Sequence, residues 1–161
     1  MEKDNFQKSE LMDVNWEQLK VISNPLRSHM IALLYEEAMT PKELADVIGK
    51  NPGTVYYHMQ QLLKHDILEI ESTRTEMGIV QKLYRAKAKY FRNPNEDIPE
   101  EMVDGGKMNI YLSETLLDQL SEELKDLFYK YVHLSLKDKD EKEQKPYAVE
   151  YVIKDFSEEE E

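Results

Sequence analysis

The side chains best suited to chemistry lie in the stretch NPGTVYYHMQQLLK, residues 51–64. Read as a helix, this stretch gathers apolar residues on one face, namely Val55, Met59, Leu62 and Leu63. The opposite face carries small, hydroxyl, aromatic and amide groups and no acid: Gly53, Thr54, Tyr57 and Gln61. Uncharged donors and acceptors of this kind suit base edges in the major groove of DNA. An ordinary solvated helix face is the alternative, so the neighbouring elements must decide between them.

Other kinds of site chemistry find little support. The chain has no cysteine, which excludes disulfides, thiolate metal sites and a cysteine nucleophile. It contains no glycine-rich phosphate loop, G-x-S-x-G or H-E-x-x-H motif. His58 and His65 lie seven residues apart and could form a metal site with Asp66 or Glu69, but a local hydrogen bond or a phosphate contact explains His58 better. We therefore expect no enzyme activity, no catalytic residues, no metal and no cofactor.

Charge is distributed unevenly along the 161 residues, whose net charge is −12. Residues 42–92 carry nine basic and six acidic side chains, whereas residues 93–161 carry eight basic and twenty acidic ones. The net-positive segment thus contains the candidate helix, and the acidic remainder would repel a phosphate backbone and favour one docking orientation. No apolar run approaches the roughly 20 residues that span a bilayer, and no secretory signal is visible. These features predict a cytoplasmic protein without membrane contact.

Helix starts are marked three times by the same dipeptide pattern, at Asn24-Pro25, Thr40-Pro41 and Asn51-Pro52. An N-cap acceptor followed by proline favours a helix start, and Glu43 completes a capping box. The pattern predicts helices over 25–37, 41–48 and 52–65. We expect buried stripes at Leu26, Met30, Ile31, Leu33 and Leu34, and at Leu44, Ala45, Val47 and Ile48. A short helix over 14–22 should place Trp16 in the core, and residues 1–13 should be frayed.

A glycine-containing turn, Gly49-Lys50-Asn51, joins the second and third of these helices, which is the helix-turn-helix pattern. The next residues predict a β-hairpin, with strands at 67–71 and 79–86 and a polar loop over 72–78. A hairpin directly after a helix-turn-helix is a wing. We expect Arg74 at its tip to enter a minor groove or hold a phosphate, the alternative being a solvated arginine.

The stretch ISNPLRSHMIALLYEEAMTPKELADVIGKNPGTVYYHMQQLLKHDILEI resembles the winged-helix DNA-binding domain of the ArsR family of bacterial and archaeal transcription regulators. The matching segments are 23–27, 40–45 and 54–59, and the resemblance spans roughly residues 14–90. It implies a dimeric repressor or activator whose recognition helices enter successive major grooves. This chain lacks the cysteines of the family's metal sensors. His65-Asp66 also replaces the Ala-Gly that relatives often have, and Tyr56 and Tyr57 replace smaller or basic residues. Tyr57 should face outward and Tyr56 should serve mostly in packing.

The second half of the chain is organised around a heptad pattern. Its apolar residues are spaced 3, 4, 3, 4 and 3 apart: Leu117, Leu120, Leu124, Leu127, Tyr131 and Leu134. This seam predicts a helix over 113–136 that pairs with a second copy, although it could instead pack on its own winged domain. Residues 137–145 read as a charged spacer. Residues 147–156 have strand-like alternation and must pair or pack with something, but their role stays open.

The predicted fold is mainly α with a small β wing (α+β), in three parts. Residues 1–92 form the winged helix-turn-helix domain, 93–112 an acidic linker, and 113–161 a helical dimerisation region with a strand-like tail. Within 86–92, the basic segment with Tyr90 and Phe91 could flank DNA or pack under the wing.

The predicted function is a homodimeric regulator that binds double-stranded DNA at a palindromic operator. The expected base-reading residues are Asn51, Thr54, Tyr57 and Gln61. The expected backbone contacts are Lys50, His58, Lys64, Arg74 and Lys82. The alternative is a winged-helix module that binds protein and not DNA. A small-molecule effector, with a pocket between linker and dimer helix, is compatible with the first hypothesis, but the sequence names no ligand.

Overall fold

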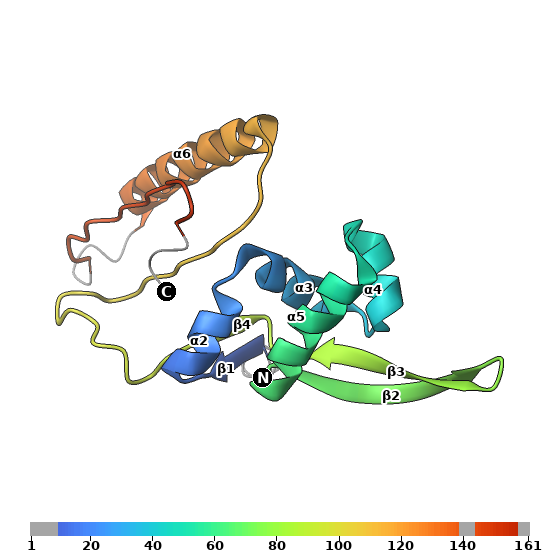
Figure 1. Ribbon diagram of the computed structural model, residues 1–161. Coiled ribbons are helices and arrows are strands. Elements are labelled where there is room, and N and C mark those ends of the chain that lie inside the picture. Colours follow the sequence, from blue (N-terminus) through green and yellow to red (C-terminus); the bar gives the residue numbers. More distant parts are fainter. Residues whose placement is uncertain (1–9, 139–143, 158–161) are drawn as a thin grey trace. The chain divides into compact units, whose positions relative to one another are not determined.

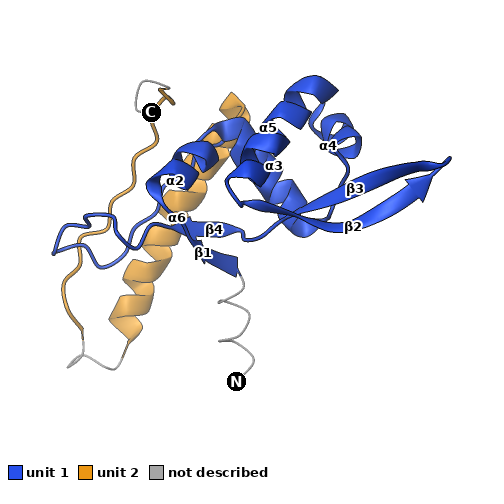
Figure 2. Cartoon of the chain, turned by 60° about the horizontal axis from the view of Figure 1, so that its bottom comes forward, with its two compact units in different colours: residues 1–110 blue, residues 111–161 orange. Residues whose placement is uncertain are grey.

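The computed structural model describes residues 10–138 and 144–157. The chain divides into two compact units, Met1–Ile110 and Tyr111–Glu161 (Figure 2). Unit 1 contains, in order, β1 (Leu11–Asp13), α2 (Trp16–Ile22), α3 (Pro25–Glu36), α4 (Pro41–Ile48), α5 (Pro52–Lys64), β2 (Leu68–Glu76), β3 (Ile79–Ala86) and β4 (Tyr90–Arg92) (Figure 1). Unit 2 contains α6 (Glu114–Lys137). The fold is a winged helix-turn-helix domain followed by a C-terminal helix, which confirms the predicted fold class.

Local capping explains where the helices of unit 1 begin. The Asn24 side chain accepts from the backbone N–H groups of Leu26 and Arg27. Thr40 and Glu43 form a reciprocal capping box, and proline occupies the first turn of α3, α4 and α5. Proline costs no hydrogen bond there, and the side-chain acceptor satisfies an otherwise unpaired N–H. The predicted starts at residues 25, 41 and 52 are confirmed.

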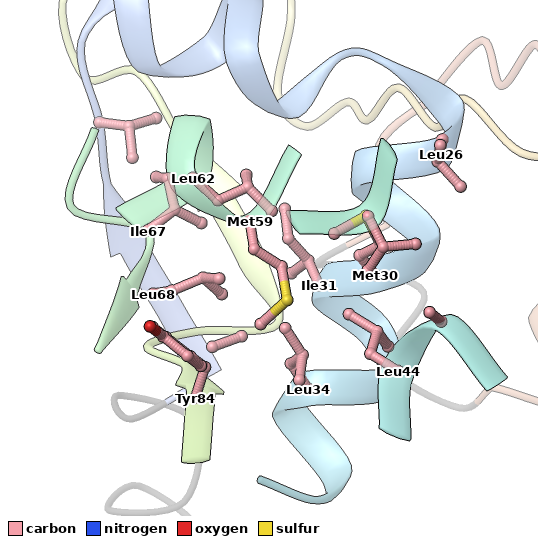
Figure 3. Packing of buried hydrophobic residues seen from close by; sticks show 14 residues of the cluster. Leu26, Met30, Ile31, Leu34, Leu44, Met59, Leu62, Ile67, Leu68 and Tyr84 are labelled. Atoms are coloured by element: carbon pink, nitrogen blue, oxygen red, sulfur yellow. The ribbon is translucent and has the colours of Figure 1, made fainter. Parts of the chain in front are cut away.

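The core lies where α3, α4 and α5 meet the base of the hairpin (Figure 3). Its fully buried side chains come from every one of these elements: Met30, Leu34, Leu44, Met59, Leu62, Ile67 and Leu68. Leu33 and Ile48 are only half-buried. Two predictions of burial are wrong, because Trp16 is 55% exposed and Val47 is 58% exposed. At about 100° per residue, Trp16 lies about 60° from Leu19 but about 120° from Ile22, and Val47 lies about 60° from Leu44 but about 160° from Ala45, so each stands at the edge of the face that reaches the core.

The wing is longer and more regular than expected. β2 and β3 pair antiparallel up to Glu76 and Ile79, with an irregularity between Ile70 and Ser72. The predicted loop over 72–78 is therefore wrong, since the turn consists of Met77 and Gly78 alone. Both have positive φ, 50° and 79°. Positive φ at both central residues is what a type I′ turn requires, and this turn matches the twist of the paired strands. Figure 1 shows the hairpin extending away from the helices.

The first and last strands of unit 1 form one short sheet. β1 and β4 pair in parallel, with Leu11 opposite Tyr90 and Asp13 opposite Arg92. Residues 11–13 are thus not frayed, contrary to expectation, while residues 1–9 lie outside the described part. Of the two aromatic residues expected either to flank DNA or to pack under the wing, Phe91 packs against the core and Tyr90 is exposed. Residues 93–113 form no helix or strand and are mostly exposed, with Asn93 buried.

Unit 2 is built on one helix. The Ser113 side chain caps α6 by accepting from the Leu116 N–H, and no residue of the helix is buried. The predicted helix over 113–136 is confirmed. The described residues 144–157 form no strand, so the strand-like alternation of 147–156 does not lead to strand pairing, but the segment does pack, as expected. Instead Tyr151 meets Phe128 edge-on at 5.4 Å between ring centroids. Residues 139–143 of the predicted spacer lie outside the described part.

Candidate nucleic-acid interface

The turn between α4 and α5 sets the direction of α5. Gly49 takes a left-handed conformation at the end of α4, and its N–H donates to the Ala45 carbonyl at 2.9 Å. The Lys50 N–H donates to the same carbonyl at 3.2 Å. Asn51 Oδ1 then accepts from the Gly53 N–H at 2.8 Å and starts α5. The amide oxygen of Asn51 is therefore engaged in the cap, which leaves its NH₂ group as the donor for any base contact.

α5 has two chemically distinct faces. Val55, Met59 and Leu62 are completely buried. Thr54 and Tyr57 are exposed and Gln61 is half-buried, so the structure brings these three predicted base readers to the accessible side of one helix. Their reading of bases stays a prediction. The expectation that Tyr56 serves in packing is wrong, because its side chain is 53% exposed beside this surface.

His58 is held from within the domain. Its Nδ1 lies 3.2 Å from Nη1 of Arg27 on α3, and its ring meets Tyr57 edge-on at 5.2 Å. Because arginine only donates, Nδ1 must accept, and the neutral ring carries its proton on Nε2. Burial lowers the pKa of His58, and the charge of Arg27 lowers it further. A phosphate contact by this residue would therefore come from a neutral N–H. Arg27 lies 31 residues away in sequence, and no sequence signal revealed this pairing.

Arg74 lies on β2 two residues before its end, opposite Gln81, and not at the tip of the wing as predicted. Its Nη2 donates to Glu43 Oε1 on α4 at 2.5 Å and to Gln81 Oε1 at 3.0 Å. Glu43 Oε2 accepts from the Thr40 N–H at 2.9 Å. The Thr40 N–H, followed by the Arg74 guanidinium, lowers the pKa of Glu43, and Glu43 raises the pKa of Arg74. Glu43 thus links the wing to the first helix of the helix-turn-helix, a role that sequence analysis missed.

A shallow cleft borders this ion pair between α4 and the wing. Its remaining lining residues are Thr40, Lys42, Asp46, Glu76 and Gln81. The mixture of charges gives the cleft no preference for one sign of ligand. Among the described residues, no group of three histidine, aspartate or glutamate side chains could hold a metal ion.

The three predicted backbone lysines are exposed at separate points of the surface. Lys50 precedes α5, Lys64 ends it, and Lys82 lies on β3 opposite Thr73. The wing also carries acids, of which Glu71 is bound to Arg85 at 2.7 Å. Cations therefore lie at both ends of α5, while the wing is mixed in charge.

The tip of the wing is apolar and exposed, which sequence analysis missed. The Met77 side chain is 97% exposed, Ile79 66% and Val80 64%. The usable signal was the Met77-Gly78 pair between two alternating segments, since a two-residue turn carries its central side chains into solvent.

The predicted dimerisation residues lie along α6. Leu117, Leu127, Tyr131 and Leu134 are exposed, and Leu120 and Leu124 are half-buried. No described helix is long and apolar enough to cross a membrane.

Comparison with protein families agrees with the helix-turn-helix arrangement. Residues 22–71 match a family described as a helix-turn-helix domain. Among solved structures, NolR from Sinorhizobium fredii aligns at 22% identity over 45% of this chain and 67% of its own, with a TM-score of 0.38. The homodimeric winged helix-turn-helix DNA-binding domain of Mb0332 from Mycobacterium bovis, a possible ArsR-family regulator, aligns at 22% identity over 45% of this chain and 63% of its own, with a TM-score of 0.38. The transcriptional repressor BigR from Xylella fastidiosa aligns at 27% identity over 53% and 76%, with a TM-score of 0.36. No curated protein matches the chain significantly.

Proposed function

We propose that this protein is a sequence-specific DNA-binding transcription regulator, on the premise that residues 22–71 are a helix-turn-helix domain. In this proposal it acts as a homodimer on a palindromic operator. The observation that carries the proposal is the accessible face of α5, where polar groups stand without a single acid. A surface of that composition next to lysines at both helix ends can approach phosphates and present donors and acceptors to base edges.

The roles follow from the positions of the side chains. Thr54, Tyr57 and Gln61 would contact base edges or thymine methyl groups, and Asn51 would donate through its NH₂. Lys50, Lys64 and Lys82 would contact phosphates. Both side-chain bonds of Arg74 described above use Nη2, so its other guanidinium nitrogens can address a phosphate while the wing stays linked to α4. His58 would contribute an uncharged Nε2–H.

The homodimer would form through the exposed apolar residues of α6. A helix with this many exposed leucine and tyrosine side chains gains stability by burying them against a partner. Two copies related by a two-fold axis read two half-sites, about 34 Å apart when they lie one helical turn from each other. The acidic second half of the chain would be repelled by phosphates and leave α5 as the favourable approach.

A second candidate is a protein-binding module without DNA affinity. The observation in its favour is the wing, where Glu69, Glu71 and Glu76 lie on β2 and the tip exposes Met77. Acids weaken attraction to phosphates, and an exposed apolar tip is a common protein contact.

A salt titration of binding to a random DNA duplex separates the two candidates. The regulator should bind weakly at low salt, with log K falling linearly as log salt rises, because bound lysines release counterions. The variant Lys50→Glu/Lys64→Glu, which reverses charge at both ends of α5, should lose this binding. Absence of binding by the unaltered protein at the lowest salt would favour the interaction module.

Selection of bound sites from a random DNA pool then tests specificity. The proposal expects an imperfect palindrome with half-sites about one helical turn apart. Binding without any enriched sequence would reduce the protein to a non-specific DNA-binding module.

A further inference from the structure

The spacing of the apolar residues in the seam of α6 is the same from either end of the helix. This seam consists of Leu117, Leu120, Leu124, Leu127, Tyr131 and Leu134, spaced 3, 4, 3, 4 and 3 residues apart. A copy turned end for end about the midpoint between residues 125 and 126 would place an apolar residue opposite every seam residue. Leu117 would meet the partner's Leu134, Leu120 the partner's Tyr131, and Leu124 the partner's Leu127. A parallel copy would also match apolar residues, so the seam alone does not fix the direction.

The charges along α6 distinguish the two directions. The first half of the helix, residues 114–125, carries four acids and one lysine. The second half, residues 126–137, carries one acid, two lysines and a histidine. A parallel pair places the acidic halves of the two helices beside each other and the basic halves beside each other, and both arrangements are repulsive. An antiparallel pair places the acidic half of each helix beside the basic half of the other, and it also opposes the two helix dipoles.

The C-terminal tail leaves one flank of the seam uncovered. Ser121, Phe128 and Ser135 line one flank at seven-residue intervals, and the tail lies against it: Tyr151 meets Phe128, and Gln144 Nε2 donates to the Ser135 carbonyl at 3.1 Å. The other flank carries Leu116, Glu123, Lys130 and Lys137 at the same interval. In an antiparallel pair, residues on the same flank of the two helices meet. Glu123 then lies beside the partner's Lys130, and symmetry repeats this pair.

We propose that two copies of this chain dimerise through antiparallel α6 helices centred between residues 125 and 126, with Glu123 of each copy beside the partner's Lys130. This inference rests on the proposed homodimer and adds its direction and register. The tail completes the interface from one side by covering the Phe128 flank, so the partner helix is left with the seam and the Glu123–Lys130 flank.

Distances between spin labels test the direction in the full-length protein. Because the chain has no cysteine, Thr115→Cys or Asp126→Cys gives one label per copy. In the antiparallel register the two labels at position 115 are separated along the helix axes by 21 residues, about 31 Å at 1.5 Å per residue, and those at 126 by about 1.5 Å. The proposal therefore expects a much longer distance at 115 than at 126. Similar distances at both positions would show a parallel pair and overturn it.

A charge exchange tests the register. Glu123→Lys and Lys130→Glu should each weaken dimerisation, by about three- to thirtyfold in Kd, because each creates two like-charge contacts. The double variant keeps the net charge and should restore the dimer. Asp118→Lys is the matched control, since Asp118 lies on the helix face away from the seam and should change Kd little. Failure of the double variant to recover any affinity would refute the Glu123–Lys130 pairing.

The outcomes separate this inference from the proposed function. A dimer with equal label distances would overturn the antiparallel arrangement and leave the DNA-binding regulator intact. An antiparallel dimer that binds no duplex at low salt would uphold the arrangement and overturn the regulator. A chain that sediments as a monomer at all accessible concentrations would overturn the arrangement together with the homodimer.

Discussion

A substitution in the two-residue turn of the wing should raise the free energy of unfolding. Met77 has φ of 50°, a left-handed conformation that costs roughly 1–2 kcal/mol for an ordinary L-residue. Its side chain is 97% exposed, so replacing it forfeits almost no buried surface. Asparagine tolerates this conformation and forms the preferred turn with a following glycine. Met77→Asn should therefore raise the free energy of unfolding, by about 0.5–1 kcal/mol once part of the left-handed cost is removed.

Gly78→Ala is the matched control with the opposite sign. Gly78 has φ of 79°, and a Cβ added there would meet no atom within 4 Å. Steric room is thus not at issue, and only the backbone conformation opposes the methyl group. We expect a loss of about 1 kcal/mol from the same left-handed cost.

Urea unfolding followed by circular dichroism measures both variants. With a slope of about 1–3 kcal/mol per molar urea, the asparagine variant should shift the midpoint upward by roughly 0.2–1 M without changing the slope. Hydrogen exchange of the amides in β2 and β3 reports the same change if the wing opens before the rest. An unchanged asparagine variant together with a tolerated alanine would mean that the turn does not have the conformation described here.

Four further predictions concern α5. Gln61→Ala should relax the preference for one base pair by roughly 1–3 kcal/mol, whereas Lys64→Ala should lower the slope of log K against log salt by about one unit for every DNA sequence. Binding isotherms on selected and random duplexes measure both effects. If Gln61→Ala weakens binding to all sequences equally, Gln61 is not a base reader. Because the pKa of His58 lies below its ordinary 6.5, the stability that this residue contributes is complete above pH 6.5 and is lost as the pH falls through its lower folded pKa. His58→Gln should flatten that part of a pH series of unfolding curves, and an unaltered series would contradict the assignment. Met59→Ala should cost about 2–5 kcal/mol, because a completely buried side chain leaves a cavity; a smaller loss in urea unfolding would mean that the site collapses or is not packed as described.

Local chemistry explains which parts of the fold could be predicted from the sequence. The starts of α3, α4 and α5 depend on a capping side chain and the proline after it, all within a few residues. The apolar spacing of α5 likewise placed Val55, Met59, Leu62 and Leu63 on its inner side, of which the first three are completely buried and Leu63 is half-buried, and the accessible side lies opposite them. Such signals are complete within one helix, and each of these predictions is confirmed.

The errors arise where distant segments decide the outcome. Periodicity placed Trp16 and Val47 on apolar faces, but the neighbouring elements cover only part of each face. Arg74 looked like a loop residue because Met77-Gly78 is an unusual pair for a tight turn, and its partner Glu43 lies 31 residues away. The segment 147–156 alternates like a strand, yet the described structure offers it the side of α6 instead of a strand edge.

The parallel pairing of β1 with β4 brings together the two ends of the winged helix-turn-helix domain. Leu11 lies opposite Tyr90, and the Arg92 guanidinium holds the Asp13 carboxylate at 2.9 Å, so the folded part of this domain starts and finishes at one place. Domains whose ends adjoin tolerate insertion into a host loop and circular permutation. Residues 11–92 could accordingly be grafted into another protein, or reopened at Met77-Gly78, with α4 and α5 left in their original order and surroundings.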